Sequence, residues 1–382
     1  MKPTRIALFV SILFATGAHA GGITLPEIAT FDSVSSVGVA NATNRTDASA
    51  MATSPAGLSA VQDYSFSIGA SYLDAASAHR GHLYNPSTGD YDIHTTTRGK
   101  KRTVLPSAAY AQRINDQVVL GASLHGEGGL GMEYSNGTMG GGLYKEQSVE
   151  IMNLHLGGAY QVADNFSIGG ALIVQNLSAE LNVPSLFDND DDSTQTSFML
   201  SAMYDFSPST YIAINYKHSA NHKLSLDSAL GPIEKNFKWP SILTIGLSHQ
   251  FDENWGMKLQ TGFEEWKEYG KADGRDMKNV YHFGAAVNYM EGNFKYQAGA
   301  RWDSKAMNDY DAQPDLPLVE QYAMGAGVEY TRANGHRVGL AYEYRNLGTP
   351  TVSYNLGTSE SIYYKGEMTS HRLHFLTLSY AY

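Results

Sequence analysis

The sequence predicts an all-β protein, a transmembrane antiparallel β-barrel of about fourteen strands with an N-terminal plug, or hatch, inside its lumen. Three features of the chain predict this fold. Apolar and polar residues alternate at a period of two in most segments after residue 60, the connections between those segments are alternately short and long, and the segment before them lacks the alternation. Each strand of such a barrel turns one face to lipid and the other to the lumen, which produces this pattern.

The alternation is clear in the second half of the chain. Phe294, Tyr296, Ala298, Ala300 and Trp302 share one face of a segment whose other face is polar or small. Aromatic residues near the ends of an apolar face are typical of the girdles of a lipid-facing barrel. The segments with this pattern are 61–75, 103–114, 116–134, 149–162, 165–181, 194–206, 209–224, 233–251, 254–269, 278–290, 292–304, 319–332, 335–347 and 369–382. Their even number is expected of a single-chain bacterial barrel.

The connections between these segments are of two kinds that alternate along the chain. The short ones are Asn115-Asp116, Ala163-Asp164, Ser207-Pro208, Asp252-Glu253, Glu291-Gly292 and Asn334-Gly335, all rich in turn-forming residues. The long ones are 76–102, 135–148, 182–193, 225–232, 270–277, 305–318 and 348–368. Transmembrane barrels have short periplasmic turns and longer outer loops. We therefore expect the long connections to face the outside of the cell.

The first sixty residues contain two further segments. Residues 1–20 have the pattern of a secretory signal: Lys2 and Arg5 precede a short apolar stretch, and Ala18-His19-Ala20 gives a cleavage site. Residues 21–60 lack alternation but carry several apolar residues, which is unusual for a solvated tail. A barrel of this size leaves a lumen that something must fill if it is not a water channel. We therefore expect residues 21–60 to form the plug and residues 61–382 to form the barrel.

Composition narrows the classes of function. The chain has no cysteine and a formal net charge of −11. An acidic protein does not fit nucleic acid as a partner, because phosphate binding needs a basic surface. No zinc-protease spacing of histidines, no phosphate-binding loop and no nucleophile elbow is present in the sequence. We therefore predict no catalytic residue, no metal site and no cofactor, and we expect the protein not to be an enzyme.

Short motifs occur along the chain in the order in which a known family has them. They are Ser54-Pro55-Ala56-Gly57-Leu58, Gly129-Leu130-Gly131-Met132-Glu133-Tyr134, Asn165-Phe166-Ser167-Ile168-Gly169, Trp239-Pro240 and Pro314-Asp315-Leu316-Pro317. With them the chain resembles the FadL-type family of outer-membrane transporters for long-chain fatty acids and aromatic hydrocarbons. The resemblance covers nearly all of the chain after the signal.

The resemblance implies a location in the outer membrane of a Gram-negative bacterium and a passive route for hydrophobic compounds. It identifies Ser54, Pro55 and Ala56 as the hatch motif, with serine where the family has asparagine. It also implies that ligand leaves sideways through a kink in the third strand, which would lie at Gly128, Gly129 and Gly131. The connections 182–193 and 225–232 are shorter than the two loops that form an outer hydrophobic groove in the fatty acid transporters.

The substrate predicted first is a long-chain fatty acid. Its carboxylate would need a cation in a desolvated lumen, and Arg301, Arg345 and Lys217 are the candidates, with pairing to lumen acids such as Glu264 and Glu343 as the alternative reading. Uptake of aromatic hydrocarbons by the same route, a general aqueous porin and an outer-membrane enzyme are the rival functions.

The expected partners follow from the prediction of a fatty acid transporter. They are a hydrophobic small molecule, outer-membrane lipid and lipopolysaccharide, and the barrel-insertion machinery, for which the final strand ending in Tyr382 resembles a signal. We expect a monomer that binds no nucleic acid.

Overall fold

The computed structural model of the chain describes residues 24–85, 87–128, 131–134, 146–183, 187–228, 231–273, 276–308, 319–355 and 363–382. The expected secretory signal lies outside these ranges, as does Gly129 of the expected kink. In the described residues, no helix is both long and apolar enough to cross a membrane.

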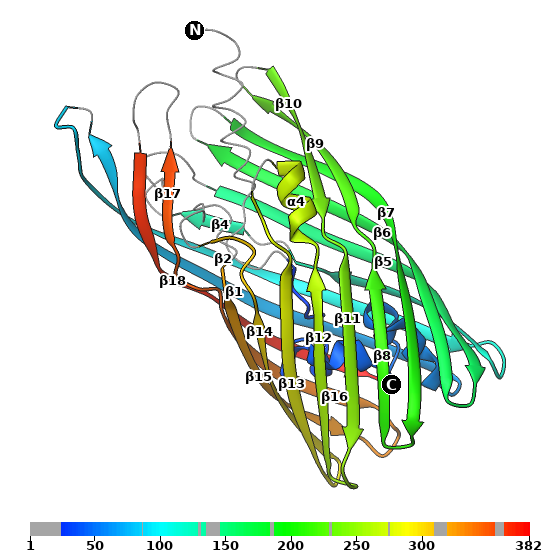
Figure 1. The fold of residues 1–382 in the computed structure, drawn as a ribbon. Helices are drawn as coiled ribbons and strands as arrows, with labels where there is room; N and C mark the ends of the chain where they lie inside the picture. The colour runs from blue at the N-terminus through cyan, green and yellow to red at the C-terminus, as the bar shows by residue number, and fades with distance from the viewer. Residues whose placement is uncertain are drawn as a thin grey trace.

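The described chain forms a closed antiparallel β-barrel (Figure 1). Its fourteen strands, in chain order, are β1 (Tyr64–Asn85), β2 (Asp90–Arg113), β3 (Val118–Gly126), β5 (Glu146–Ala163), β6 (Phe166–Val183), β7 (Phe187–Ser207), β8 (Thr210–Lys217), β11 (Ile242–Gln250), β12 (Trp255–Glu264), β13 (Val280–Glu291), β14 (Phe294–Asp303), β15 (Gln321–Thr331), β16 (Arg337–Asn346) and β18 (Tyr363–Ala381). Each pairs with its neighbours, and β1 closes the barrel by pairing with both β2 and β18. The predicted fold class is confirmed.

Three additions extend the strands at the end opposite the short turns. The third strand continues after a break as β4 (Gly131–Tyr134), and β9 (Ala220–Ser228) with β10 (Gly231–Trp239) forms a hairpin beyond β8 and β11. The strand β17 (Thr351–Asn355) pairs with β18. The β9–β10 hairpin, β17 and the long β1–β2 hairpin project toward the top of Figure 1.

Several sequence predictions were wrong in this outer region. The predicted connection 182–193 is strand where the structure describes it, because β6 reaches Val183 and β7 begins at Phe187. The described residues of the connection 225–232 likewise belong to β9 and β10. The connection 76–102 is mostly strand, because β1 and β2 stay paired out to Asn85 and Asp90. Apolar and polar residues alternate along a strand when one face contacts lipid and the other faces the lumen. The alternation is lost where both faces of a hairpin are in water. The predicted strand 254–269 ends at Glu264, and the helix α4 (Trp266–Asp273) follows it.

The short turns between strands gather at the opposite end, as expected. Gly292 and Gly335 take φ values of 57° and 84°, which favour glycine over other residues. In the β11–β12 turn, the Asp252 carboxylate accepts the backbone N–H groups of Asn254 at 2.8 Å and Trp255 at 2.7 Å. These hydrogen bonds stabilise the charged form and lower the pKa of Asp252.

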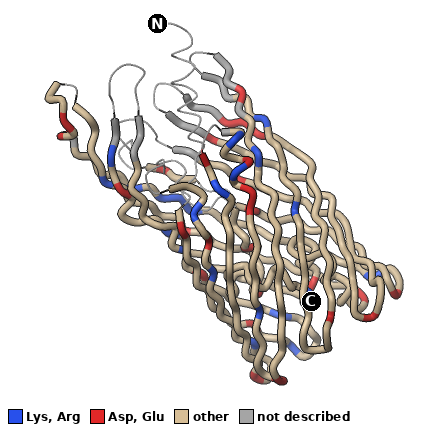
Figure 2. The backbone as a smooth tube through the Cα atoms, viewed as in Figure 1, with Lys and Arg blue, Asp and Glu red and all other residues tan. Residues whose placement is uncertain are grey.

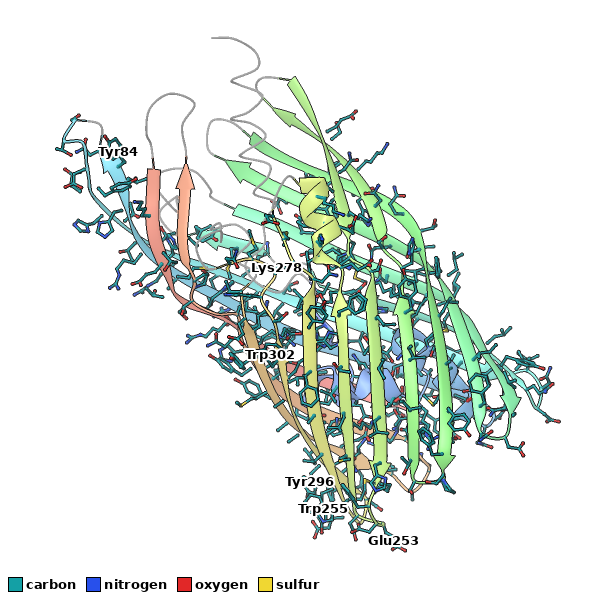
Figure 3. All side chains as sticks on the ribbon, viewed as in Figure 1. Tyr84, Glu253, Trp255, Lys278, Tyr296 and Trp302 are labelled. Carbon is teal, nitrogen blue, oxygen red and sulfur yellow. The ribbon has the colours of Figure 1, made fainter. Side chains whose placement is uncertain are left out.

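The outer wall of the barrel is apolar between two charged ends. Large side chains such as Leu172 and Phe283 point outward and are 53% and 54% exposed. Charged residues gather at the two ends, and most of the visible wall between them is uncharged (Figure 2). Trp255 and Tyr296 mark the end with the short turns, and Trp302 lies nearer the other end (Figure 3). This surface is the one that a lipid bilayer needs.

Residues 24–60 lie inside the barrel, and most of them are buried. They form four short helical elements: α2 (Phe31–Ser35), η1 (Val39–Thr43), α3 (Ala50–Thr53) and η2 (Pro55–Ala60). The wall provides small inward-facing residues where this segment touches it. At Gly169 a Cβ would lie 2.3 Å from the backbone nitrogen of Ala56, so the hatch needs glycine there.

The two ends can be assigned to the two sides of the membrane by thiol labelling. We expect a cysteine at Ser87, in the exposed tip of the β1–β2 hairpin, to react with a membrane-impermeant thiol reagent on whole cells. A cysteine at Asn334, equally exposed but in a short turn, should react only after lysis. The cysteine-free chain gives no background. Labelling of Asn334→Cys but not Ser87→Cys on whole cells would reverse the assigned orientation.

Candidate functional site

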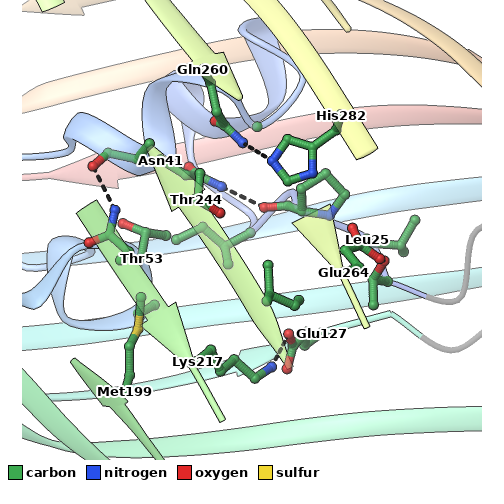
Figure 4. Close-up of a pocket in the computed structure, with 18 of the residues that line it drawn as sticks. Leu25, Asn41, Thr53, Glu127, Met199, Lys217, Thr244, Gln260, Glu264 and His282 are labelled. Carbon is green, nitrogen blue, oxygen red and sulfur yellow. Dashed lines mark hydrogen bonds and ion pairs between the residues drawn. The ribbon is translucent and has the colours of Figure 1, made fainter. Parts of the chain in front are cut away.

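A small cavity lies in the lumen between the outer side of the hatch and the wall (Figure 4). Its volume is about 100 Å³. Leu25 and Ile28 line it from the hatch, and Met199 and Ile242 line it from the wall. Charged side chains border the same space, including Lys217 and Arg301. The carboxylates of Glu127 and Glu264 border it as well, so the cavity joins apolar surface to charged groups of both signs.

Lys217 belongs to a polar network that crosses the lumen. Its ammonium forms an ion pair with Glu127, and the two side chains are 9% and 12% exposed. The Asn153 side chain donates to the same carboxylate, as does Gln175 Nε2 at 3.4 Å. Glu127 directly follows β3, where the third strand breaks. The network therefore ties the broken part of the third strand to β8, across the lumen.

Arg301 and Arg345 are buried in the lumen, near the ends of β14 and β16 that lie opposite the short turns, and both are paired with acids. Arg301 Nη2 lies 2.6 Å from Asp303 Oδ1 and 3.5 Å from Glu264 Oε1. Asp303 Oδ2 lies 3.5 Å from Arg345 Nη1, so the two arginines share this carboxylate.

Arg345 also reaches the hatch. Its Nη2 lies 2.5 Å from Glu27 Oε1 and 3.1 Å from Glu343 Oε1. In the described structure each of the three predicted cations, Lys217 included, thus has a carboxylate partner. That any of these cations binds a substrate carboxylate stays a prediction. To do so, the substrate carboxylate would have to displace the acid with which the cation is already paired.

Further ion pairs attach the hatch near the short-turn end. Arg337 Nη2 lies 2.7 Å from Asp47 Oδ2, and Lys295 pairs with Asp32 at 2.5 Å. Arg45 of the hatch pairs with Asp205 of β7 at 3.0 Å and covers the ring of Tyr211 at 3.6 Å.

The hatch motif docks on β6 and β7. Ser201 Oγ accepts the backbone N–H of Ala56 at 3.2 Å and lies 3.4 Å from Ser54 Oγ. Ser167 Oγ donates to the carbonyl of Ala56 at 3.1 Å. Pro55 begins the 3₁₀ helix η2, a position that needs no N–H donor. These contacts hold Ser54, Pro55 and Ala56 against the wall.

The barrel wall has a gap beside the third strand. Pairing of β2 with β3 stops at Ser107 and His125, and pairing with β4 resumes only at Lys100 and Glu133. In the described residues, 101–106 of β2 therefore have no partner on this side, although they stay paired with β1. On its other side, the third strand stays close to β5, where the Glu127 N–H donates to the carbonyl of Ile151 at 2.9 Å.

Glycines occupy the break in the third strand. Gly128 has a φ of 67°, a conformation that a β-branched residue rarely adopts, and Gly131 begins β4. A cavity of about 150 Å³ lies in the gap, between Leu73 of β1, Leu105 of β2 and Val149 of β5, and both glycines line it.

A buried aromatic cluster lies beyond the hatch at the outer end of the barrel. Phe237 and Trp239 of β10 pack with Trp266 and Tyr269 of α4, and the ring centroids of Trp239 and Trp266 are 6.2 Å apart. The same apolar cluster includes Val149 of β5, which lines the wall gap. Sequence reasoning missed this cluster, because it assigned 266–269 to a strand and 270–277 to a loop.

One polar atom in the aromatic cluster is unsatisfied. The indole nitrogen of Trp239 is buried without a hydrogen-bond partner in the described structure, whereas that of Trp266 donates to Glu264 Oε2 at 2.8 Å. A buried donor without a partner is costly. The cluster therefore combines packed apolar side chains with one buried donor that lacks an acceptor.

Comparisons with known proteins agree with this architecture. Outer membrane protein P1 of Haemophilus influenzae is 25% identical over 258 residues, which are 63% of this chain and 53% of that protein. The long-chain fatty acid transport protein of Salmonella typhi is 30% identical over 172 residues, 44% of this chain and 37% of that protein. The chain thus aligns with about half, or less, of the length of these relatives.

Two solved structures share the fold. A FadL homologue of Pseudomonas aeruginosa has a TM-score of 0.81 at 14% identity, with 94% of this chain and 99% of that chain covered. The toluene transporter TodX of Pseudomonas putida has a TM-score of 0.63 at 15% identity, with 87% and 93% covered. A family model for the outer membrane protein transport proteins (OMPP1/FadL/TodX) matches residues 11–382. The chain is therefore an outer-membrane β-barrel that belongs to the OMPP1/FadL/TodX family.

Proposed function

We propose that this protein carries long-chain fatty acids passively across the outer membrane and releases them sideways through the gap beside the third strand. The observation that carries the proposal is the joint position of three features. The aromatic cluster, the wall gap with its glycines and the cations of the lumen cavity all lie on the outer side of the hatch. An amphipathic molecule could move between them without crossing the hatch.

Apolar side chains line one side of the path for the acyl chain. Val149 and Ile151 belong to the same buried cluster as Trp239 and Trp266, and both also line the cavity in the gap. Burial of each CH₂ group contributes about 0.8 kcal/mol, so a long chain gains substantially from such a surface. A sideways exit would deliver the chain into the bilayer instead of into water.

The polar end of a fatty acid needs a different environment. Lys217 borders the lumen cavity, and its partner Glu127 holds the third strand beside the gap. A substrate carboxylate that displaced Glu127 from Lys217 would also break the ion pair that fixes the third strand beside the gap. Binding of the substrate would thereby favour movement of the strand segment that borders the exit.

Uptake of aromatic hydrocarbons is the second candidate, and the aromatic cluster favours it. A protein similar in fold, TodX, is described as a toluene transporter. A toluene molecule would use the same apolar surface but would need no cation. A general porin needs an open lumen, whereas residues 24–60 pack across the lumen of this barrel. The family is described as transport proteins, which disfavours an outer-membrane enzyme.

Uptake of three probes by cells separates these functions. In a strain without its own fatty acid transporter, expression of this protein should raise the uptake of labelled oleate well above that of methyl oleate or toluene, since only oleate has a carboxylate for Lys217. The empty vector is the control. Faster uptake of toluene with no gain for oleate would contradict the fatty acid proposal and favour the hydrocarbon route. Large stable ion conductance of the pure protein in planar bilayers would favour a porin.

A further inference from the structure

An acidic cluster on neighbouring strands remains unexplained by transport. Glu264 of β12, His282 of β13 and Asp303 of β14 are 4%, 2% and 5% exposed. Register brings them together, because His282 is the direct cross-strand partner of Asp303 and Glu264 pairs two residues away, at Val280. One nitrogen or carboxylate oxygen from each of the three lies within 4.8 Å of the others.

The ion pairs around this cluster contain more carboxyl groups than guanidinium groups. In the described residues, the ion pairs that connect it set the guanidinium groups of Arg301 and Arg345 against four carboxylates. Those carboxylates belong to Glu27, Glu264, Asp303 and Glu343, all of which are buried. Buried charges are expected to be paired or to bind a metal. With all four acids ionised and His282 neutral, a dication would neutralise the cluster.

His282 has the arrangement of a metal ligand. With the Gln260 side-chain amide oriented so that its nitrogen donates to the carbonyls of Gly38 at 2.8 Å and Val39 at 3.0 Å, its oxygen faces His282 Nε2 at 3.4 Å. That contact places the imidazole proton on Nε2 and the lone pair on Nδ1. Nδ1 is buried and has no hydrogen-bond partner among the residues that the structure describes. A histidine that ligates a metal usually donates its other N–H to such a neighbour.

The two carboxylates each keep one oxygen for a cation. Glu264 Oε2 accepts from Thr24 and from Trp266, while among the described residues Oε1 has only the 3.5 Å contact with Arg301. Asp303 Oδ1 accepts from Arg301 at 2.6 Å, while Oδ2 makes only the 3.5 Å contact with Arg345 within the part of the chain that the structure describes. Glu264 and His282 also line the lumen cavity, which gives an ion a way in and leaves room for water (Figure 4).

We propose that Glu264, His282 and Asp303 form a binding site for a divalent transition-metal ion of the Zn²⁺ class. One imidazole with two carboxylates suits zinc, which takes nitrogen and oxygen ligands at about 2.0–2.2 Å. Tetrahedral ligands around one ion lie roughly 3.4 Å apart, so groups that lie within 4.8 Å of one another have to approach by about an ångström. The ion would join three strands and, through the Thr24–Glu264 hydrogen bond, the start of the described hatch. The site goes beyond the proposed transport function.

Zinc titration of the purified full-length barrel in detergent tests the site. In competition with a chromophoric chelator, the wild type should bind one zinc ion that His282→Gln binds at least tenfold more weakly. His222→Gln is the matched control: His222 is equally buried, but its ring nitrogens already contact the Ser193 carbonyl at 3.1 Å and Gln175 at 2.9 Å. This variant should bind zinc as the wild type does.

A direct measurement keeps the test decisive if a variant fails to fold. Crystals of the wild type soaked in zinc should show anomalous density at the zinc edge between the three side chains, and Glu264→Gln can replace His282→Gln in solution. Equal zinc binding by wild type and His282→Gln, or zinc density only at other histidines, would overturn the proposal. Because the readout is metal and not uptake, its outcome is independent of transport.

Discussion

Gly128→Val should reduce fatty acid uptake about tenfold or more, since valine at this glycine disfavours the break in the third strand. Gly128 holds a φ of 67°, and a β-branched residue there costs about 1–3 kcal/mol. The cheaper alternative for the variant is a regular strand, whose pairing with residues 101–106 of β2 would close the gap. Initial rates of labelled oleate uptake, normalised to the amount of folded barrel, measure the effect.

Gly292→Val is the control for backbone strain. Gly292 has a φ of 57° in the β13–β14 turn, with no atom within 4 Å of where a Cβ would lie. Valine at this position has a similar unfavourable conformational energy but lies far from the gap. The variant should therefore have a lower free energy of unfolding and an unchanged rate of oleate uptake. Equal loss in both variants would mean that strain alone explains the effect. Unchanged uptake in correctly inserted Gly128→Val would contradict lateral release and favour passage through the hatch.

The barrel could be predicted from sequence because its constraints are local. Phe294, Tyr296 and Trp302 face outward in the structure as their spacing requires, and turns such as Glu291-Gly292 lie where strands end. Lipid on one face and a crowded lumen on the other impose this pattern on each strand by itself. The outer hairpin and α4 were missed because water surrounds or partly surrounds them and removes that contrast.

The site could be predicted only in part, because its contacts join distant parts of the chain. Periodicity placed Lys217, Arg301 and Arg345 in the lumen, but their partners depend on how strands and hatch meet. Arg345 and Glu27 are 318 positions apart, and their contact exists only once the hatch is inserted. The proposed zinc ligands become neighbours through strand register, which no local motif records.

Arg345→Met should lower the free energy of unfolding by about 3–5 kcal/mol, the cost typical of removing one partner from a buried ion pair. Arg345 is 1% exposed, and it is bound to Glu27 of the hatch and Glu343 of its own strand. The substitution leaves both carboxylates buried without this cation. Equilibrium unfolding in urea, followed by tryptophan fluorescence in detergent micelles, measures the change.

Arg80→Met provides the matched comparison. Arg80 pairs with Glu367, but the two side chains are 67% and 50% exposed, so the same substitution should cost less than about 1 kcal/mol. Glu27→Gln combined with Arg345→Met should be less harmful than the sum of the two single variants, because removing Glu27 removes one of the uncompensated charges. Additive effects in this cycle, or equal losses for Arg345→Met and Arg80→Met, would show that the Arg345–Glu27 pair does not hold the hatch to the wall.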